Sequence, residues 1–225
     1  MKEIVDLSLA LENGITPFPL GRHPAFESSV VASIAEHGRE IRRFTMGSHT
    51  ATHIDAMRHF LPGGRAIEQI PLSTLVGPAS LIHLDGLKPH AVIDVAELRP
   101  RVENGPVDRL LIRTDWSRFW GTPQYYEGWP SLTDAATRYL IRLGIQLLGL
   151  DFPSPDLPYF GNDCSLDSPN HKLLFAHDVV LVEYLTNLSA LPEGRLHLMV
   201  MPLKLTGFDG APARVAAYPL DPLRQ

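Results

Sequence analysis

A dense group of imidazole and carboxylate side chains lies between residues 47 and 60. It comprises His49, His53, Asp55 and His59. Imidazole and carboxylate are ligands that divalent ions such as zinc, manganese or iron accept in proteins. The alternatives are a solvated histidine-rich loop and histidines that hydrogen-bond inside the core. The density of the group favours a metal site.

The spacing of these residues restricts the backbone that could bring them together. In an extended strand, His49 and His53 would lie about 13 Å apart, too far to share an ion. In a helix they would be neighbours, but Asp55 would point away from His53. We therefore expect a strand over residues 41–48 whose end breaks into a tight turn through residues 50–55, which would gather the three side chains.

A second pair of candidate ligands occurs near the C-terminus, at His171 and Glu183. Glu183 ends the apolar run of residues 178–183, which is typical of a buried strand. A buried carboxylate costs several kcal/mol, on the order of a lost ion pair, unless it is paired or binds a metal. Glu183 is therefore the more informative residue of the pair.

The order His49-Thr-Ala-Thr-His53-Ile-Asp55, with His59 following, resembles the signature of a known family. This is the metal-dependent cyclase/hydrolase family that includes bacterial kynurenine formamidase and isatin hydrolase. The spacing from His171 to Glu183 is similar to the second metal-binding pair of the family. The segments 185–188 and 202–214 are similar to its C-terminal signatures, so the resemblance extends from about residue 4 to residue 217.

Two positions depart from the family pattern. Ala51 stands where the family usually has glycine, so the turn must use backbone angles that an alanine accepts. Met57 stands where the family usually has proline, which places a flexible apolar side chain beside the expected pocket. Met57 therefore bears more on substrate specificity than on metal binding.

The resemblance implies a kynurenine formamidase-like α/β fold of the swivelling β/β/α type, with a mixed β-sheet or barrel-like core and flanking helices. Residues 1–225 would form a single domain. The implied cofactor is a pair of divalent metal ions, Zn²⁺ or alternatively Mn²⁺. The implied ligands are His49, His53 and Asp55 on one ion and His171 and Glu183 on the other, with Asp55 bridging.

The resemblance also implies a hydrolase. A metal-bound hydroxide would attack the carbonyl of a small amide, such as an aryl formamide or a lactam, and His59 would be the catalytic acid and base. Phe18 corresponds to an aromatic residue that lies over the site in the family, so it is a substrate contact or a plain hydrophobic anchor. The alternatives are a lactone hydrolase or cyclase, and a metal-binding family member without catalysis.

Composition restricts the partners of the protein. The chain has 225 residues, 44% of them hydrophobic, and a net charge of −5, which gives no electrostatic case for binding nucleic acid. It contains no signal-peptide pattern and no apolar run long enough to span a membrane, so we expect a cytoplasmic protein without membrane contact. The single Cys164 excludes an intrachain disulfide and is expected to be inert. From the resemblance, we expect a small-molecule substrate and a homo-oligomer, either a dimer or a tetramer.

The remaining pattern predicts an α/β arrangement. The most secure helix follows Ser131-Leu-Thr-Asp134, interpreted as its cap, and ends at Gly144. It lies between the predicted strands 110–114 and 145–150, which makes a strand-helix-strand unit. A second helix is predicted to start at Ser168 as the N-cap, with Pro169 in its first turn. Further strands are predicted at 4–9, 26–35, 79–84 and 196–201 (with His197 structural), a short helix at 95–98, and an aromatic pocket wall or a surface loop at 119–129.

Overall fold

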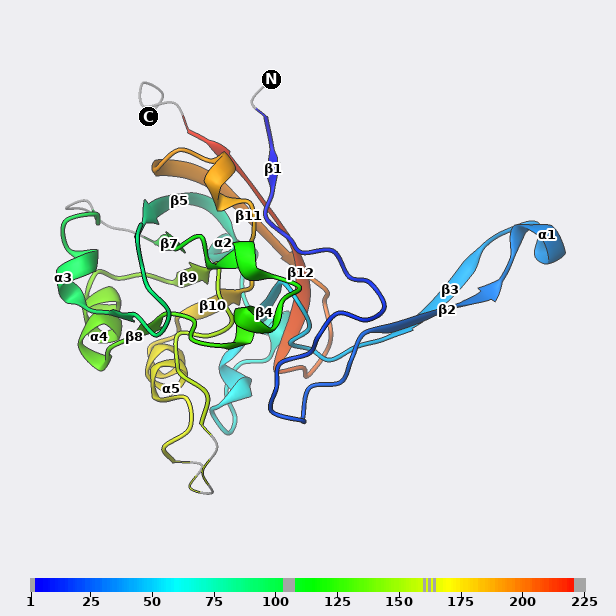
Figure 1. Cartoon of the computed structure of the whole chain (residues 1–225), viewed down its shortest axis with the longest axis horizontal. Coiled ribbons are helices and arrows are strands. Elements are labelled where there is room, and N and C mark those ends of the chain that lie inside the picture. Colours follow the sequence, from blue (N-terminus) through cyan, green and yellow to red (C-terminus); the bar gives the residue numbers. More distant parts are fainter. Residues whose placement is uncertain (1–2, 103–107, 160, 162, 164, 221–225) are drawn as a thin grey trace.

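A closed ring of seven strands forms the core of the described chain (Figure 1). The computed structural model describes residues 3–102, 108–159, 161, 163 and 165–220, so Cys164 lies outside the described residues. The ring runs β12-β11-β5-β7-β9-β10-β4 and closes because β4 also pairs with β12; β1 adds to the edge of β12. The bounds are β1 Val5–Asp6, β4 His53–Asp55, β5 Val76–His83, β7 Arg109–Arg113, β9 Leu147–Leu150, β10 Val180–Glu183, β11 Gly194–Pro202 and β12 Gly210–Pro219.

Four neighbouring strands of the barrel are parallel, and two of them are fully buried. Strands β5, β7, β9 and β10 run parallel to one another, and every residue of β9 and β10 is buried. This agrees with their nearly continuous apolar sequences, because parallel strands are covered on both faces. The predicted strand-helix-strand unit is confirmed as β7, α4 (Asp134–Arg142) and β9.

The capping prediction for α4 was wrong in one detail. The N-cap is Thr133, whose hydroxyl accepts from the N–H of Ala136 at 3.0 Å. Ser131 belongs instead to β8 (Ser131–Leu132), which pairs with β6 (Val92–Ile93). Gly144 follows the helix at φ 82°, a left-handed angle that stops it as expected.

The other helices are short. They are α1 Ile34–His37, α2 Leu72–Leu75, α3 Val95–Leu98 and α5 Pro169–Ala176, together with the 3₁₀ turns Met57–His59, Ile67–Gln69, Trp116–Phe119, Pro123–Tyr126 and Leu188–Ala190. Helix α3 has the predicted bounds, and its N-cap is Asp94. No helix among the described residues is long and apolar enough to cross a membrane.

A two-stranded arm projects from the body in Figure 1. It consists of β2 (Glu27–Ala32) and β3 (Ile41–Thr45), with α1 at its tip. The predicted strand 26–35 is shorter in the structure, because Ser33 caps α1 and Gly38 ends it at φ 69°. The predicted strand 41–48 begins at Ile41 but ends at Thr45. The predicted strand 4–9 is also shorter, since only Val5 and Asp6 pair with β12.

The expected turn through residues 50–55 was wrong in its position. Turns and bends occupy residues 48–52, and residues 53–55 form β4, which is hydrogen-bonded to β10 on one side and β12 on the other. Ile54 is fully buried between these strands, which accounts for the extended backbone. Ala51 adopts φ 54°, so alanine occupies a left-handed conformation that favours glycine, contrary to our expectation. Together these elements confirm a single α/β domain with a mixed β-barrel core.

Candidate metal centre

Strands β4 and β10 place three of the predicted ligands on one face. Residues two apart on a strand share a face, so His53 and Asp55 point the same way, and Glu183 lies directly opposite His53 in the antiparallel pair. All three are at most 4% exposed. His53 Nε2 lies 3.0 Å from Asp55 Oδ1 and 3.5 Å from Glu183 Oε2.

Helix α5 brings His171 to the same point. His171 Nε2 lies 3.5 Å from Asp55 Oδ2 and 3.3 Å from Glu183 Oε1. The helix start is fixed by Asp156, whose carboxylate accepts from the N–H groups of Asn170 at 2.9 Å and His171 at 3.0 Å. Ser168 is the N-cap residue of α5, as predicted, but it sits at φ 48° and its side chain makes no cap hydrogen bond.

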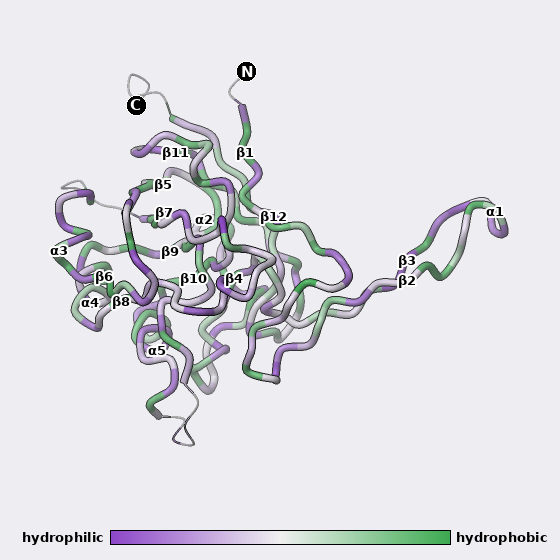
Figure 2. Tube along the Cα trace, in the orientation of Figure 1, coloured by the Kyte–Doolittle hydropathy of each residue, from purple (hydrophilic) through white to green (hydrophobic). Residues whose placement is uncertain are grey.

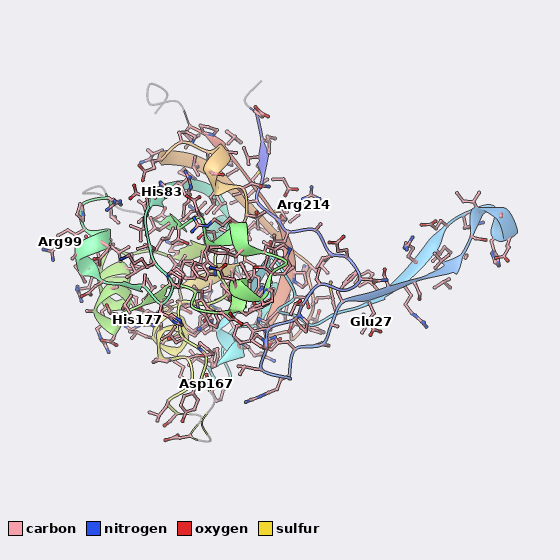
Figure 3. All side chains as sticks on the ribbon, viewed as in Figure 1. Glu27, His83, Arg99, Asp167, His177 and Arg214 are labelled. Atoms are coloured by element: carbon pink, nitrogen blue, oxygen red, sulfur yellow. The ribbon has the colours of Figure 1, made fainter. Side chains whose placement is uncertain are left out.

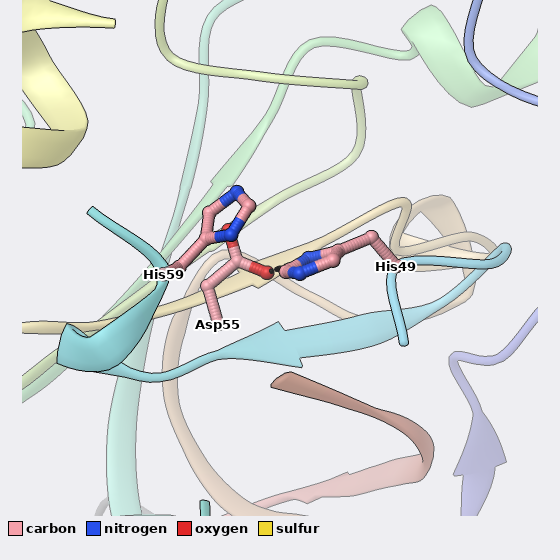
Figure 4. A group of neighbouring side chains, drawn as sticks. All are labelled: His49, Asp55 and His59. Carbon is pink, nitrogen blue, oxygen red and sulfur yellow. Dashed lines mark hydrogen bonds and ion pairs between the residues drawn. The ribbon is translucent and has the colours of Figure 1, made fainter. Parts of the chain in front are cut away.

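The turn before β4 delivers His49. Its Nδ1 lies 2.7 Å from Asp55 Oδ1, the contact drawn in Figure 4. The backbone of β12 packs against the other side of the ring, because a Cβ added at Gly210 would come within 2.8 Å of His49 Cε1. Only glycine allows this approach.

His59 lies in the 3₁₀ turn that follows β4, beside His49. The two ring centroids are 4.0 Å apart, and both rings contact Asp209. Asp209 Oδ2 lies 2.8 Å from His49 Nε2 and 3.1 Å from His59 Nδ1. The structure therefore gathers His49, His53, Asp55, His59, His171 and Glu183 as the motif predicts.

The sequence interpretation missed Asp209 and Asp156. Asp209 lies inside the segment 202–214, which was noted only as a signature. Asp156 follows the predicted strand 145–150 by a few residues. Its position just after a buried strand was the only feature of the sequence that could have indicated a role in the site.

The ligand atoms fall into two groups that could each hold an ion. Those of His53, Asp55 and Glu183 lie within 4.8 Å of one another, as do those of His49, Asp55 and His59. Asp55 belongs to both groups. Buried His/Asp/Glu clusters of this kind support a metal site.

The electrostatics show that this centre favours positive charge. Burial opposes the charged imidazole of His53, yet the Asp55 and Glu183 carboxylates raise its pKa to about 10. The pKa of His171 is likewise raised against burial, by Asp156, Asp55 and Glu183. Burial acts to raise the pKa of Asp55, but His49 and His53 hold it well below its usual value. A divalent cation would supply the same compensation and displace protons from these ligands.

In each imidazole of the ligand set, the ring nitrogen that does not face Asp55 contacts a backbone carbonyl or a carboxylate. His53 Nδ1 lies 2.7 Å from the carbonyl of Ala51, His171 Nδ1 lies 2.7 Å from Asp156, and His49 Nε2 faces Asp209. This pattern is typical of metal-binding histidines, whose other nitrogen is oriented by a carbonyl or carboxylate. Glu183 Oε1 is buried and lies 3.3 Å from His171 Nε2, but it accepts no hydrogen bond within the described chain, as expected of an oxygen available to a cation. The residues present therefore fit a divalent metal centre.

The centre lies at the base of a pocket of about 390 Å³. Phe18 lines this pocket, and its ring meets those of Tyr126 at 5.8 Å and Trp129 at 5.7 Å. Tyr126 and Trp129 of the aromatic stretch 119–129 thus pack against Phe18, whereas no residue of that stretch lines this pocket itself. His197 stacks on Tyr218 across the paired strands β11 and β12, and neither residue lines the pocket, in agreement with a structural role.

Comparison with known proteins agrees with this geometry. Residues 5–157 match the family described as "Putative cyclase". The kynurenine formamidase of Bacillus cereus is 33% identical over 219 residues, covering 97% of this chain and 98% of the relative. Among solved structures, isatin hydrolase A from Labrenzia aggregata, bound to benzyl benzoate, has a TM-score of 0.82 at 26% identity, covering 97% and 94% of the two chains.

A structure described as a predicted metal-dependent hydrolase from Bacillus stearothermophilus has a TM-score of 0.76 at 28% identity, covering 97% of this chain and 98% of that chain. The chain belongs to the cyclase family. It is a cyclase-family hydrolase related to kynurenine formamidase and isatin hydrolase.

Proposed function

We propose that this protein is a metal-dependent hydrolase that cleaves a small, non-peptide amide, such as an aryl formamide or a lactam. One observation carries the proposal. His49, His53 and His171 each have one ring nitrogen oriented by a carbonyl or carboxylate and the other nitrogen directed at Asp55. His53 and His171 also face Glu183, whose buried Oε1 accepts no hydrogen bond. The amide preference follows from the activities named for the related proteins.

We assign His49, His53 and Asp55 to one ion and His171 and Glu183 to a second, with Asp55 shared. The two oxygens of Asp55 support this division, since Oδ1 faces His49 and His53 while Oδ2 faces His171. Zn²⁺ or Mn²⁺ suits this donor set, and such ions polarise a carbonyl and acidify water when bound.

We assign His59 to proton transfer and Phe18 to substrate contact. The His59 side chain is 25% exposed, compared with 2% for that of His53, so it can reach a substrate in the pocket. His59 would give a proton to the departing nitrogen as the C–N bond breaks. Phe18 offers an aromatic face to a ring in the substrate, held in place by Tyr126 and Trp129.

Metal reconstitution followed by a hydrolysis screen tests the function. The protein is stripped with chelator, reloaded with Zn²⁺ or Mn²⁺, and assayed on aryl formamides, lactams and lactones. We expect up to two ions per chain and preferential turnover of an amide. Preferential turnover of lactones would support the ester alternative, and metal binding without turnover would support a binding protein. Fewer than one ion per chain in a folded protein would refute the metal assignment.

We also propose that the protein is a homo-oligomer. The projecting arm leaves large apolar side chains exposed, among them Val31 at 59%, Ile34 at 69% and Phe44 at 56%. An isolated two-stranded hairpin is marginally stable in water, so an arm of this kind is stabilised by packing against another surface. A second copy of this chain is the proposed surface.

A further inference from the structure

The carboxylate of Asp209 contacts two imidazoles of the site with a single oxygen. Asp209 is the last residue before β12, and its carbonyl accepts from the N–H of Ala56 at 2.8 Å, directly after β4. Its side-chain Oδ2 lies 2.8 Å from His49 Nε2 and 3.1 Å from His59 Nδ1. The same short segment therefore links the backbone of the ligand strand to both rings.

Asp209 is held in this position from both sides. Its backbone is fixed by the hydrogen bond from Ala56, and the next residue, Gly210, packs directly against Ile54 and His49. An added Cβ at Gly210 would lie 2.7 Å from the carbonyl oxygen of Ile54. Because the backbone at Asp209 is fixed, its carboxylate moves little and can orient the imidazoles that it contacts.

The two contacts determine where the hydrogen on His59 lies. Asp209 Oδ2 faces one nitrogen of each ring, and each of these contacts needs a hydrogen between the oxygen and the ring nitrogen. An ionised carboxylate can only accept, so His59 carries its hydrogen on Nδ1. The His59 ring makes no other hydrogen bond with a described residue, and it lines the pocket. Its Nε2 is therefore available to a substrate.

We propose that Asp209 is a positioning residue that fixes the tautomer and orientation of His59 and so presents His59 Nε2 to the bond that is cleaved. The proposal rests on the proposed hydrolase function. During hydrolysis, His59 Nε2 accepts a proton from the attacking water as the new C–O bond forms. It returns that proton to the departing nitrogen as the C–N bond breaks, while Asp209 keeps its charge and stabilises the imidazolium.

The test must separate positioning from a general effect of negative charge in the pocket. The key variants are Asp209→Ala and Asp209→Asn. Asp167→Asn is the matched control, since the Asp167 carboxylate lines the same pocket but accepts from Ser168 Oγ at 3.0 Å instead of contacting a histidine. All variants are made in the full chain, and their folding is checked by circular dichroism.

The first measurement does not require activity. Nitrogen-15 NMR of the metal-free protein reports which nitrogen of His59 carries the hydrogen. We expect Nδ1–H in the wild type and in Asp167→Asn, and a shift towards Nε2–H in Asp209→Ala. Nε2–H in the wild type, or an unchanged tautomer in Asp209→Ala, would overturn the proposal.

The second measurement compares leaving groups in the metal-loaded enzyme. An anilide needs protonation to depart, whereas an activated aryl ester scarcely does. We expect Asp209→Ala to lower kcat/KM about 10–100-fold for the anilide, the usual effect of losing an orienting partner, and much less for the ester, with metal content unchanged. Equal losses on both substrates, an equal change of the ratio in Asp167→Asn, or loss of metal would each overturn the proposal. If the wild type hydrolyses nothing, the proposed function fails, while the tautomer measurement still decides the role of Asp209.

Discussion

At the scale of single residues, the burial of Glu183 is the strongest indication of a metal centre. Its carboxylate is almost fully buried, and one oxygen accepts no hydrogen bond from the described residues. His171 Nε2 lies 3.3 Å from this oxygen, but a buried oxygen that accepts no hydrogen bond costs up to about 1–3 kcal/mol. A bound cation would offset that cost, which makes Glu183 the most direct test of the centre.

Replacing Glu183 by glutamine should weaken the second ion far more than the first. The neutral amide is a poorer ligand, and loss of a direct ligand should exceed the about 10–100-fold effect of changing an outer partner. Elemental analysis after chelator competition measures both ions. Glu193→Gln is the control, because Glu193 is exposed and accepts from the N–H of His83. Equal weakening of both ions would contradict separate binding sites.

His59 decides between an enzyme and a metal-binding protein. We expect His59→Ala to retain near-normal metal content while the rate falls by about 10²–10⁴, the usual contribution of a general acid or base. The loss should be larger on an anilide than on an activated aryl ester. The parallel measurements are kcat/KM on this pair and metal per chain, with the exposed His37→Ala on the arm as the control. Loss of metal would make His59 a ligand, which the geometry of the His49, Asp55 and His59 group permits.

At the scale of elements, the start of helix α5 depends on a residue distant in sequence. The Asp156 carboxylate caps the helix through the N–H groups of Asn170 and His171, and it also holds His171 Nδ1. We expect Asp156→Ala to lower the free energy of unfolding by about 1–3 kcal/mol, from the lost cap and the unpaired imidazole. Ser168→Ala, at the cap position that the sequence favours, should change it by less than about 0.5 kcal/mol. Urea unfolding of the metal-free protein measures both.

The Asp156 effect should also depend on pH with a defined sign. Burial opposes the ionised carboxylate, but the hydrogen bonds from His171 and Asn170 hold the pKa of Asp156 below its usual value. The folded state therefore binds fewer protons than the unfolded state. The stabilisation is complete above the ordinary aspartate pKa of about 3.9 and is lost as pH falls through the lower value. A difference between wild type and Asp156→Ala that persists undiminished below that pKa would contradict the assignment.

The sequence predicted the residues that belong to a local pattern, but not those whose partners lie elsewhere in the chain. His49, His53 and Asp55 were found because they stand in one short motif, and α4 and β9 were found because their apolar spacing matches their burial. Asp156 and Asp209 were missed because their partners come from other elements, so only the folded chain reveals them. The turn before β4 was misplaced because Ile54 is buried between β10 and β12, a tertiary constraint that overrides local pattern.

At the scale of the whole molecule, the barrel and the arm are built differently. The barrel closes on a continuous core, whereas every residue of β3 is exposed. Figure 2 shows apolar positions distributed along the arm, and Figure 3 shows its side chains standing clear of the body beyond Glu27. The arm therefore contributes little to the stability of the barrel, and its apolar residues are available to a second chain.

Oligomerisation through the arm gives the last prediction. Val31 and Ile41 are 59% and 49% exposed near the tip, so Val31→Lys with Ile41→Lys would place two charges in any interface there. Burying an unpaired charge costs several kcal/mol, on the order of breaking a buried ion pair, which would dissociate a modest interface. We expect light scattering to show an oligomer for the wild type and a monomer for the double variant, with the same thermal unfolding of the barrel at low concentration. Leu72→Lys is the control, since Leu72 is 65% exposed on α2 of the body. A monomeric wild type, or a double variant that keeps the wild-type mass, would exclude the arm as the interface.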